Sequence, residues 1–273
     1  MNTAPVVRCW IDGEPGASVD AADRGLHYGD GLFETLRVEA GRVRWLARHL
    51  ARLERGAARL GIALPPAELL ADELAGAAAG RTRALLKLIV TRGSMQRRGY
   101  RPSGTERTRR ILTAHDWPAD DGAPLRLIRS RIVLGTSPAL AGLKHLNRLE
   151  NVLAQREAAQ RGADEALLSG RQGDSICGSM SNLIVCTEEG MLTPALDQAG
   201  VEGVMRSLAL DAAAALGVSL PVVHVDATLW PRVQAIYCCN VRWGLRRAGE
   251  LDGQPLGNAP PLAELQRWID AQP

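Results

Sequence analysis

Hydrophobic and polar residues follow two rhythms along the chain, and each rhythm predicts a different kind of element. Short apolar or alternating runs predict β-strands, at residues 6–11, 17–19, 35–38, 84–91, 109–114, 125–134, 166–168, 183–186, 191–192, 222–225 and 235–239. Longer stretches with an apolar residue every three or four positions predict helices, at residues 46–60, 67 to about 79, 148–160, 204–216 and 261–269. This mixture of strands and helices predicts an α/β (α+β) fold.

The pattern also divides the chain into two predicted domains. Residues 115–124 are polar and contain two prolines, so regular structure is expected to stop there and to resume at Leu125. We therefore expect a small N-terminal domain over residues 1–116, a linker over 117–123 and a large C-terminal domain over 124–273. The length of 273 residues and the hydrophobic content of 46% support a sizeable core.

Composition narrows the class of protein. The formal net charge of +3 is spread over the chain, which argues only weakly for a polyanionic partner such as nucleic acid. The five cysteines have neither disulfide-framework nor metal-ligand spacing, so we expect a reducing compartment and no metal. No apolar run approaches the roughly 18 residues of a membrane span, and the N-terminus does not resemble a signal peptide. The sequence predicts a cytoplasmic protein that binds neither nucleic acid nor membranes.

Lysine is rare in this chain, which draws attention to Lys144. Only two of the 33 Lys and Arg residues are lysine, Lys87 and Lys144. Where a positive charge suffices this chain uses arginine, so a lysine suggests chemistry that a guanidinium cannot perform. An amine can lose its proton, attack a carbonyl and form a Schiff base. The alternative is that Lys144 is an ordinary solvated loop cation.

Two further features favour binding of an anion. Gly200 and Gly203 precede the helix predicted at residues 204–216, and the free N–H groups of a helix N-terminus suit a phosphate. Arg52 lies at the border of the apolar stripe of helix 46–60, from where it could reach an anion or simply be solvated. A Schiff-base lysine, a phosphate seat and an arginine are together what pyridoxal phosphate requires.

The segment of residues 92–101 contains the densest group of arginines and is called here the arginine-rich loop. Its arginines could hold an anionic substrate or be solvated. A non-catalytic anion- or nucleic-acid-binding module is therefore the alternative to an enzyme.

Motifs along nearly the whole chain resemble one family. They are residues 140–150 around Lys144, Asp164-Glu165-Ala166-Leu167, residues 196–201, Asp23-Arg24-Gly25, Gly29-Asp30-Gly31-Leu32-Phe33 and His49-Leu50-Ala51-Arg52-Leu53. They resemble the 4-amino-4-deoxychorismate lyases, which belong to the fold-type IV pyridoxal-phosphate enzymes together with branched-chain and D-amino acid aminotransferases. The resemblance implies a two-domain fold-type IV enzyme with its cofactor in the interdomain cleft, and a homodimer.

The resemblance also implies roles for individual residues. Lys144 would bind pyridoxal 5'-phosphate covalently and transfer protons, while Arg52 and the amides of Val204 and Met205 would bind its phosphate. The other positions matched to the cofactor site are Cys177, Asn182, Gly203, Asn240 and Val241. Candidates for contact with an anionic substrate are Tyr28, Arg97, Arg98 and Arg101.

One position departs from the family pattern. Cys177 stands where family members usually carry a glutamate that holds a proton on the pyridine nitrogen. A thiol is usually neutral near pH 7 and hydrogen-bonds weakly, so the electron sink would be weaker than in a transaminase. The resemblance implies a lyase that converts 4-amino-4-deoxychorismate to 4-aminobenzoate and pyruvate in folate biosynthesis, and Cys177 favours this lyase over a transaminase. A fold-type IV aminotransferase is the alternative within the enzyme class.

Overall fold

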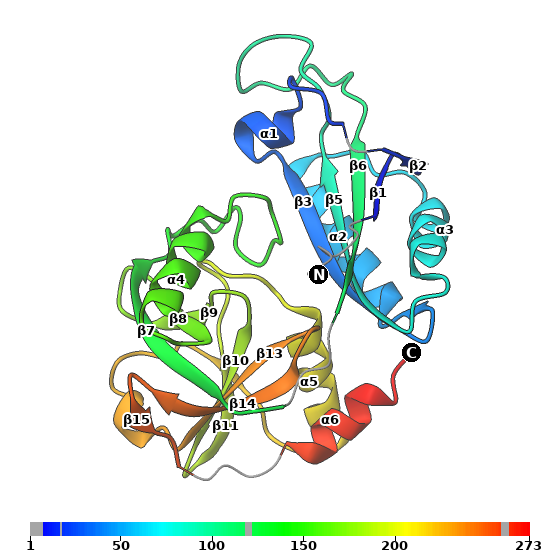
Figure 1. The fold of residues 1–273 in the computed structure, drawn as a ribbon. Helices are drawn as coiled ribbons and strands as arrows, with labels where there is room; N and C mark the ends of the chain where they lie inside the picture. Colours follow the sequence, from blue (N-terminus) through cyan, green and yellow to red (C-terminus); the bar gives the residue numbers. More distant parts are fainter. Residues whose placement is uncertain (1–7, 17, 118–121, 258–261) are drawn as a thin grey trace, which may run out of the picture. The chain divides into compact units, whose positions relative to one another are not determined.

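The computed structural model describes residues 8–16, 18–117, 122–257 and 262–273. Their contacts divide the chain into two compact units. The first contains the described residues of Met1–Ala119 with Lys144–Asn147 and Pro273, and the second contains those of Asp120–Leu143 and Arg148–Gln272. Each unit has its own sheet (Figure 1). The predicted linker lies largely outside the described residues, so the domain limits stay a prediction.

The first unit is built on an antiparallel sheet in the order β2-β1-β6-β5-β3-β4. Its strands are β1 (Arg8–Ile11), β2 (Glu14–Pro15), β3 (Gly31–Glu39), β4 (Arg42–Val43), β5 (Arg83–Thr91) and β6 (Arg109–Asp116). Its helices are α1 (Arg24–Tyr28), α2 (Leu46–Leu60) and α3 (Ala67–Ala78). Helix α2 contacts β3, and α3 contacts β4, β5 and β6.

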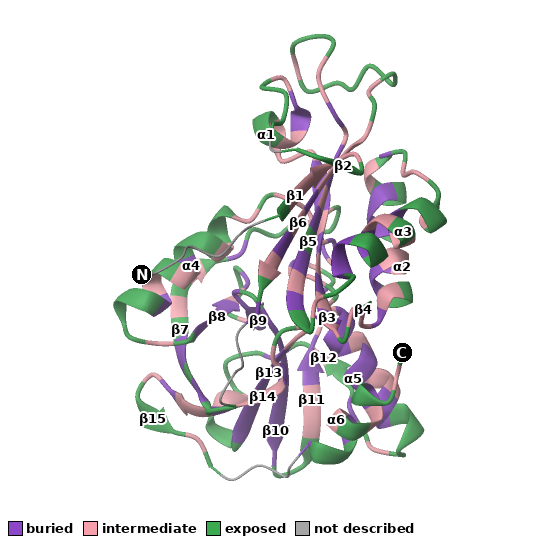
Figure 2. Cartoon of the chain, turned by 45° about the vertical axis from the view of Figure 1, so that its right-hand side comes forward, coloured by how far each residue is buried: buried purple, intermediate pink, exposed green. Residues whose placement is uncertain are grey.

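Strand β3 explains how this unit acquires both a core and a polar cluster. Successive side chains of a strand point to opposite faces, and alternate residues of β3 are buried: Leu32, Glu34, Leu36 and Val38. Figure 2 shows this buried sheet beside α2 and α3. Three of the four residues are apolar and form core. The fourth, Glu34, brings a carboxylate into the same buried row.

The second unit is built on a nine-stranded mixed sheet in the order β12-β11-β10-β13-β14-β7-β8-β9, with β15 paired to β14. Its strands are β7 (Leu125–Val133), β8 (Glu165–Ser169), β9 (Ser175–Gly178), β10 (Asn182–Thr187), β11 (Gly190–Pro194), β12 (Val222–Val223), β13 (Ala235–Asn240), β14 (Gly244–Leu251) and β15 (Gln254–Pro255). Its helices are α4 (Leu149–Gln160), α5 (Val204–Ala215), the short 3₁₀-helix η1 (Trp230–Arg232) and α6 (Ala263–Asp270).

Packing in the second unit follows from its apolar strands. Every residue of β10 is buried, as expected for a strand covered on both faces. Helix α4 contacts β7 and β8, α5 contacts β13, and α6 contacts α5. In the part of the chain that the structure describes, no helix is both long and apolar enough to cross a membrane.

All five predicted helices are confirmed, although residue 261 at the start of the last one lies outside the described residues. The strand predicted at residues 17–19 is wrong, because Ser18 and Val19 are not in a strand, while residue 17 is not described. Residues 6 and 7 of the first predicted strand are also outside the described part. Periodicity missed α1, β2, β4, β9, β14, β15 and η1. All of these except β14 have at most five residues, too few to show a period, and β14 carries Arg246 and Arg247 between its buried positions.

Candidate functional site

Lys144 lies on the edge of strand β3. The Phe33 N–H donates to the Lys144 carbonyl at 2.9 Å, and the Leu146 N–H donates to the Gly31 carbonyl at 3.0 Å. Residues 144–146 therefore pair with residues 31–33 of β3, at the end of β3 that β4 does not cover. This pairing fixes the backbone of Lys144. Its Nζ lies 4.2 Å from the centroid of the Phe33 ring.

The two lysines differ in their surroundings. Lys144 is half-buried, whereas Lys87 on β5 is exposed. Both amines lie over the same aromatic ring, since Nζ of Lys87 is 5.2 Å from the Phe33 centroid. Lys87 is therefore a natural control for the chemistry predicted for Lys144.

Arg52 is buried in a cluster of three polar side chains. Its Nε donates to Oε1 of Glu34 at 2.8 Å, and its Nη2 lies 2.5 Å from Oε2. His49, one helical turn earlier on α2, has its Nδ1 2.6 Å from the same Oε2. All three side chains are at most 9% exposed. The two-point ion pair fixes the plane of the guanidinium.

This burial corrects the helical pattern inferred for α2. Arg52 was predicted at the border of a stripe formed by Leu46, Leu50, Leu53, Ala57 and Leu60. The buried residues of α2 are His49, Arg52, Leu53, Gly56 and Ala57, so the inward face is turned towards His49 and Arg52 is buried at its edge. The cause is Glu34, whose buried carboxylate supplies partners for both side chains. In the sequence, the signal for this buried cluster is Glu34 itself, which occupies an apolar position in the alternating pattern of β3.

Electrostatics keep Glu34 ionised and His49 neutral. Burial raises the pKa of Glu34, but the charge of Arg52 and the hydrogen bond from His49 outweigh it and lower the pKa from 4.5 to about 2. Burial lowers the pKa of His49, and the charges of Arg52 and Lys144 lower it further, against the effect of Glu34. A neutral His49 donates from Nδ1 to Glu34. Its Nε2 has no hydrogen-bond partner among the described residues.

The predicted phosphate seat begins at Gly203, the N-cap of α5. Asn182, the first residue of β10, donates from Nδ2 to the Val201 carbonyl at 2.8 Å and accepts at Oδ1 from the Gly203 N–H at 3.1 Å. A Cβ at position 203 would overlap Oδ1 of Asn182, so only glycine allows this approach. The structure thus gives Asn182 a role in orienting the helix start. Val204 and Met205 follow as the first buried residues of α5.

Cys177 is a buried residue of β9 and lies near the carboxylate of Glu165. Burial, together with the nearby charge of Glu165, raises the pKa of the Cys177 thiol to about 12, so the thiol is neutral. Glu165 on β8 lies in one of the family motifs and is not among the predicted site residues. Burial also raises its pKa, which its hydrogen bonds partly oppose.

Glu165 organises the turn between β9 and β10. Oε1 accepts from the Ser179 N–H at 2.9 Å and from the Ser179 hydroxyl, and Oε2 accepts from the Ser181 hydroxyl at 2.8 Å. Further donors to this carboxylate are the N–H groups of Ala166 and Met180 and the amide of Gln155. This carboxylate anchors the turn that leads into Asn182.

The remaining predicted residues occupy turns and surface positions. Asn240 accepts at Oδ1 from the N–H groups of Arg242 and Trp243, both at 2.9 Å, and so shapes the turn that contains Val241. Tyr28 ends α1, and its ring lies 5.2 Å from that of Tyr100. The side chains of the arginine-rich loop at positions 97, 98 and 101 are exposed.

The chemistry of these donor sets fits pyridoxal phosphate. The first unit holds an amine and an oriented guanidinium, which are groups for an aldehyde and a phosphate. The second unit holds a helix start with a glycine that a side chain could not replace, and the free N–H groups of a helix start suit a phosphate. Among the residues that the structure describes, no group of three or more His, Cys, Asp or Glu side chains is arranged to hold a metal ion.

Comparison with known proteins agrees with this fit. The family model described as amino-transferase class IV matches residues 31–251. Aminodeoxychorismate lyase of Vibrio harveyi is 31% identical over 266 residues, or 95% of this chain and 97% of the relative. A putative branched-chain-amino-acid aminotransferase of Methanocaldococcus jannaschii is 31% identical over 258 residues, or 90% and 86%. Among solved structures, 4-amino-4-deoxychorismate lyase from Pseudomonas aeruginosa has a TM-score of 0.89 and 39% identity, covering 96% of this chain and 97% of that chain.

These matches confirm the fold-type IV α/β fold and favour an enzyme over the non-catalytic alternative. Both kinds of relative, lyase and aminotransferase, extend over most of the chain. The chain belongs to the amino-transferase class IV family of pyridoxal-phosphate enzymes.

Proposed function

We propose that this enzyme is a pyridoxal-phosphate-dependent lyase that converts 4-amino-4-deoxychorismate to 4-aminobenzoate and pyruvate. The observation that carries the proposal is the 39% identity and TM-score of 0.89 to the Pseudomonas aeruginosa lyase over 96% of the chain. The aminotransferase relative from Methanocaldococcus jannaschii is 31% identical.

Lys144 is proposed as the covalent attachment point and the proton-transfer residue. When bound, the cofactor supplies an aldehyde for amines and an electron sink for a developing carbanion. Once the substrate amine has taken its place, the Lys144 amine would take the proton from the ring carbon that bears the substrate nitrogen. The backbone bonds to β3 fix the main chain from which this amine extends. Loss of enolpyruvate would then leave an aromatic ring.

The phosphate is proposed to bind Arg52 and the start of α5. Glu34 orients the Arg52 guanidinium, and a guanidinium has five N–H donors, so one edge can serve Glu34 while others serve a phosphate. Asn182 holds Gly203 so that the amides of Val204 and Met205 begin the helix. Asn240 and Val241 are proposed to close the phosphate end.

The surroundings of Cys177 support a lyase more than a transaminase. A transaminase must stabilise a carbanion until another carbon is protonated, and a carboxylate beside the pyridine nitrogen helps it to do so. Cys177 offers a neutral thiol instead. The nearby Glu165 already accepts bonds from the turn of residues 178–182. Aromatisation of the product supplies driving force that a lyase can use.

Four further assignments complete the proposal. Tyr28, Arg97, Arg98 and Arg101 would contact the substrate, which carries two carboxylates, from the first unit. The enzyme would work as a homodimer in the cytoplasm. Domain limits at residues 116 and 124 are part of the same proposal.

Product analysis tests this function directly. The purified protein, loaded with pyridoxal phosphate, should form 4-aminobenzoate and pyruvate in equal amounts from 4-amino-4-deoxychorismate, and Lys87→Arg should behave alike. Absence of 4-aminobenzoate, together with consumption of an added 2-oxo acid in the presence of an amino acid donor, would instead establish an aminotransferase. The relative from Methanocaldococcus jannaschii is what makes this second function worth testing.

A further inference from the structure

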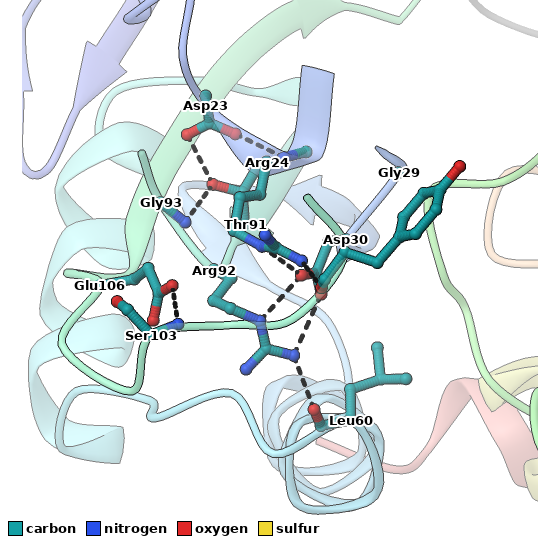
Figure 3. A network of polar contacts seen from close by, with 12 residues as sticks. Asp23, Arg24, Gly29, Asp30, Leu60, Thr91, Arg92, Gly93, Ser103 and Glu106 are labelled. Atoms are coloured by element: carbon teal, nitrogen blue, oxygen red, sulfur yellow. Dashed lines mark hydrogen bonds and ion pairs between the residues drawn. The ribbon is translucent and has the colours of Figure 1, made fainter. Parts of the chain in front are cut away.

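The motifs around Arg24 and Asp30 form a polar network to which the proposed chemistry assigns no role. Asp30 lies between two arginines, as Figure 3 shows. Arg24 donates from Nε to Oδ2 of Asp30 at 2.8 Å, and Arg92 donates from Nε to the same oxygen at 2.8 Å. The Arg24 side chain is 4% exposed and that of Asp30 14%. One carboxylate therefore aligns two guanidinium groups.

Arg24 also holds the far end of the arginine-rich loop. Its Nη1 donates to the Gly99 carbonyl at 3.2 Å, and its Nη2 donates to the Tyr100 carbonyl at 2.6 Å. The guanidinium carbon lies 5.0 Å from the centroid of the Tyr28 ring, which in turn lies against Tyr100. A single buried side chain thus joins α1 to two consecutive carbonyl groups of the loop.

Arg92 holds the near end of the same loop. It donates from Nη1 to the Gly61 carbonyl at 2.6 Å and from Nη2 to the Leu60 carbonyl at 2.7 Å. These carbonyls lie at the C-terminus of α2, where a positive charge is favourable. Between the two anchored ends, Arg97 and Arg98 are exposed. The loop is fixed near its ends, while the side chains of Arg97, Arg98 and Arg101 are exposed.

We propose that Arg24, held by Asp30, is a positioning residue for substrate binding, because it fixes the arginine-rich loop in the arrangement that presents Arg97, Arg98 and Arg101 to an anionic substrate. The proposal rests on the proposed function, in which these arginines attract carboxylates. A loop already ordered before binding loses less conformational entropy when the ligand arrives. Removing the anchor should therefore weaken substrate binding and leave the chemical step unchanged.

The test compares Arg24→Lys with Arg55→Lys in the full-length, cofactor-loaded enzyme. Lysine keeps the charge beside Asp30, but it lacks the fork that reaches Asp30 and two carbonyls together. Arg55 is an exposed residue of α2, so its variant makes the same exchange outside the network. Trypsin cleavage after Arg97 and Arg98, followed by mass spectrometry of the fragments, reports how firmly the loop is held in the folded enzyme.

Arg24→Lys should speed this cleavage about tenfold and raise KM for 4-amino-4-deoxychorismate about tenfold, with kcat within about twofold of the unmodified enzyme. Arg55→Lys should change none of the three. Unchanged cleavage in Arg24→Lys, or faster cleavage with unchanged KM, overturns the proposal. Tyr100→Ala, at a side chain that is 83% exposed, provides a second variant if Arg24→Lys fails to fold. This variant should also speed cleavage and raise KM, by smaller factors. No effect of Tyr100→Ala on either quantity would count against the proposal.

The outcomes separate this inference from the proposed function. If the unmodified enzyme releases no 4-aminobenzoate, the proposed function fails, and so does the substrate role inferred for Arg24, whatever the cleavage rates. If the unmodified enzyme is an active lyase while Arg24→Lys matches it in cleavage and KM, only the inference about Arg24 fails.

Discussion

At the scale of single residues, Lys144 carries the chemical proposal. Lys144→Arg keeps a positive charge, but a guanidinium stays protonated and cannot condense with an aldehyde. We expect loss of the cofactor's absorbance band near the visible edge and a fall in kcat of at least about 100-fold. Lys87→Arg, beside the same Phe33 ring, should keep both. Spectra of the two purified variants decide the assignment, which is wrong if the band persists in Lys144→Arg.

The cluster of Glu34, His49 and Arg52 predicts how stability depends on pH. The pKa of Glu34 is about 2 in the folded protein and 4.5 ordinarily, so its ionisation stabilises the fold above pH 4.5, by about 3 kcal/mol, and this contribution is lost as the pH falls towards 2. Burial also lowers the pKa of His49. Below pH 6.5 the unfolded chain therefore binds a proton at His49 more readily than the folded protein does, so His49 also makes the free energy of unfolding fall as the pH falls.

Denaturant unfolding between pH 3 and 8 measures this dependence. Glu34→Gln should lower the free energy of unfolding at pH 7 and flatten its decline below pH 4.5. The control is Glu54→Gln, at an exposed residue of α2, which should leave the profile as it is. If Glu34→Gln and Glu54→Gln have the same slope below pH 4.5, the buried ion pair does not govern acid stability.

Variants of Cys177 test whether a carboxylate at this position increases amino transfer. Cys177→Glu would place a second carboxylate near buried Glu165, where like charges raise each other's pKa. We expect destabilisation of about 1–3 kcal/mol from overpacking and increased amino transfer to 2-oxo acids. Cys177→Gln matches the size without the charge, so a gain in transfer only for Cys177→Glu would assign the effect to the carboxylate. Equal transfer by both variants, or robust transfer by the unmodified enzyme, would refute the argument.

At the scale of elements, the start of α5 depends on strand β10. Asn182→Ala removes both the acceptor for the Gly203 N–H and the donor to Val201, and a buried group left without its partner costs about 1–3 kcal/mol. We expect the affinity for pyridoxal phosphate to fall about tenfold or more, as measured by equilibrium titration. Asn182→Asp retains the acceptor and should lose less. Equal affinities in all three proteins would show that this bond does not shape a phosphate site.

Elements also show where pattern reasoning succeeds. Long amphipathic helices such as α2 and buried strands such as β5 and β10 were predicted, because many residues repeat the same period. Helix α1 has five residues and depends on a local bond from the Gly25 N–H to the Asp23 carboxylate. Gly29 then ends α1 with a φ of 63°, a conformation that glycine adopts easily. Such short elements are set by individual hydrogen bonds, which a periodic pattern does not contain.

At the scale of the whole molecule, the family suggests a homodimer. Leu149, Val152 and Leu153 on α4 are exposed apolar side chains, a kind of surface that association often covers. Sedimentation of the purified protein should give a mass twice the chain mass of 29.3 kDa. A species of single-chain mass at micromolar concentration would contradict this expectation.

The family and the fold class could be predicted from the linear chain, because motif spacing and hydrophobic periodicity are properties of the sequence. Residue chemistry also predicts Lys144 as the amine for the cofactor and Arg52 as a residue able to meet an anion.

The partners of these residues depend on the tertiary structure. Glu34 and Arg52 are 18 positions apart, and Arg24 reaches carbonyls 75 and 76 positions away. Such bonds form because strand pairing and helix packing bring remote segments together, so no local pattern reveals them. The burial of Arg52 and the anchoring of the arginine-rich loop are consequences of the fold, because the fold places Glu34 beside Arg52 and Asp30 beside Arg24.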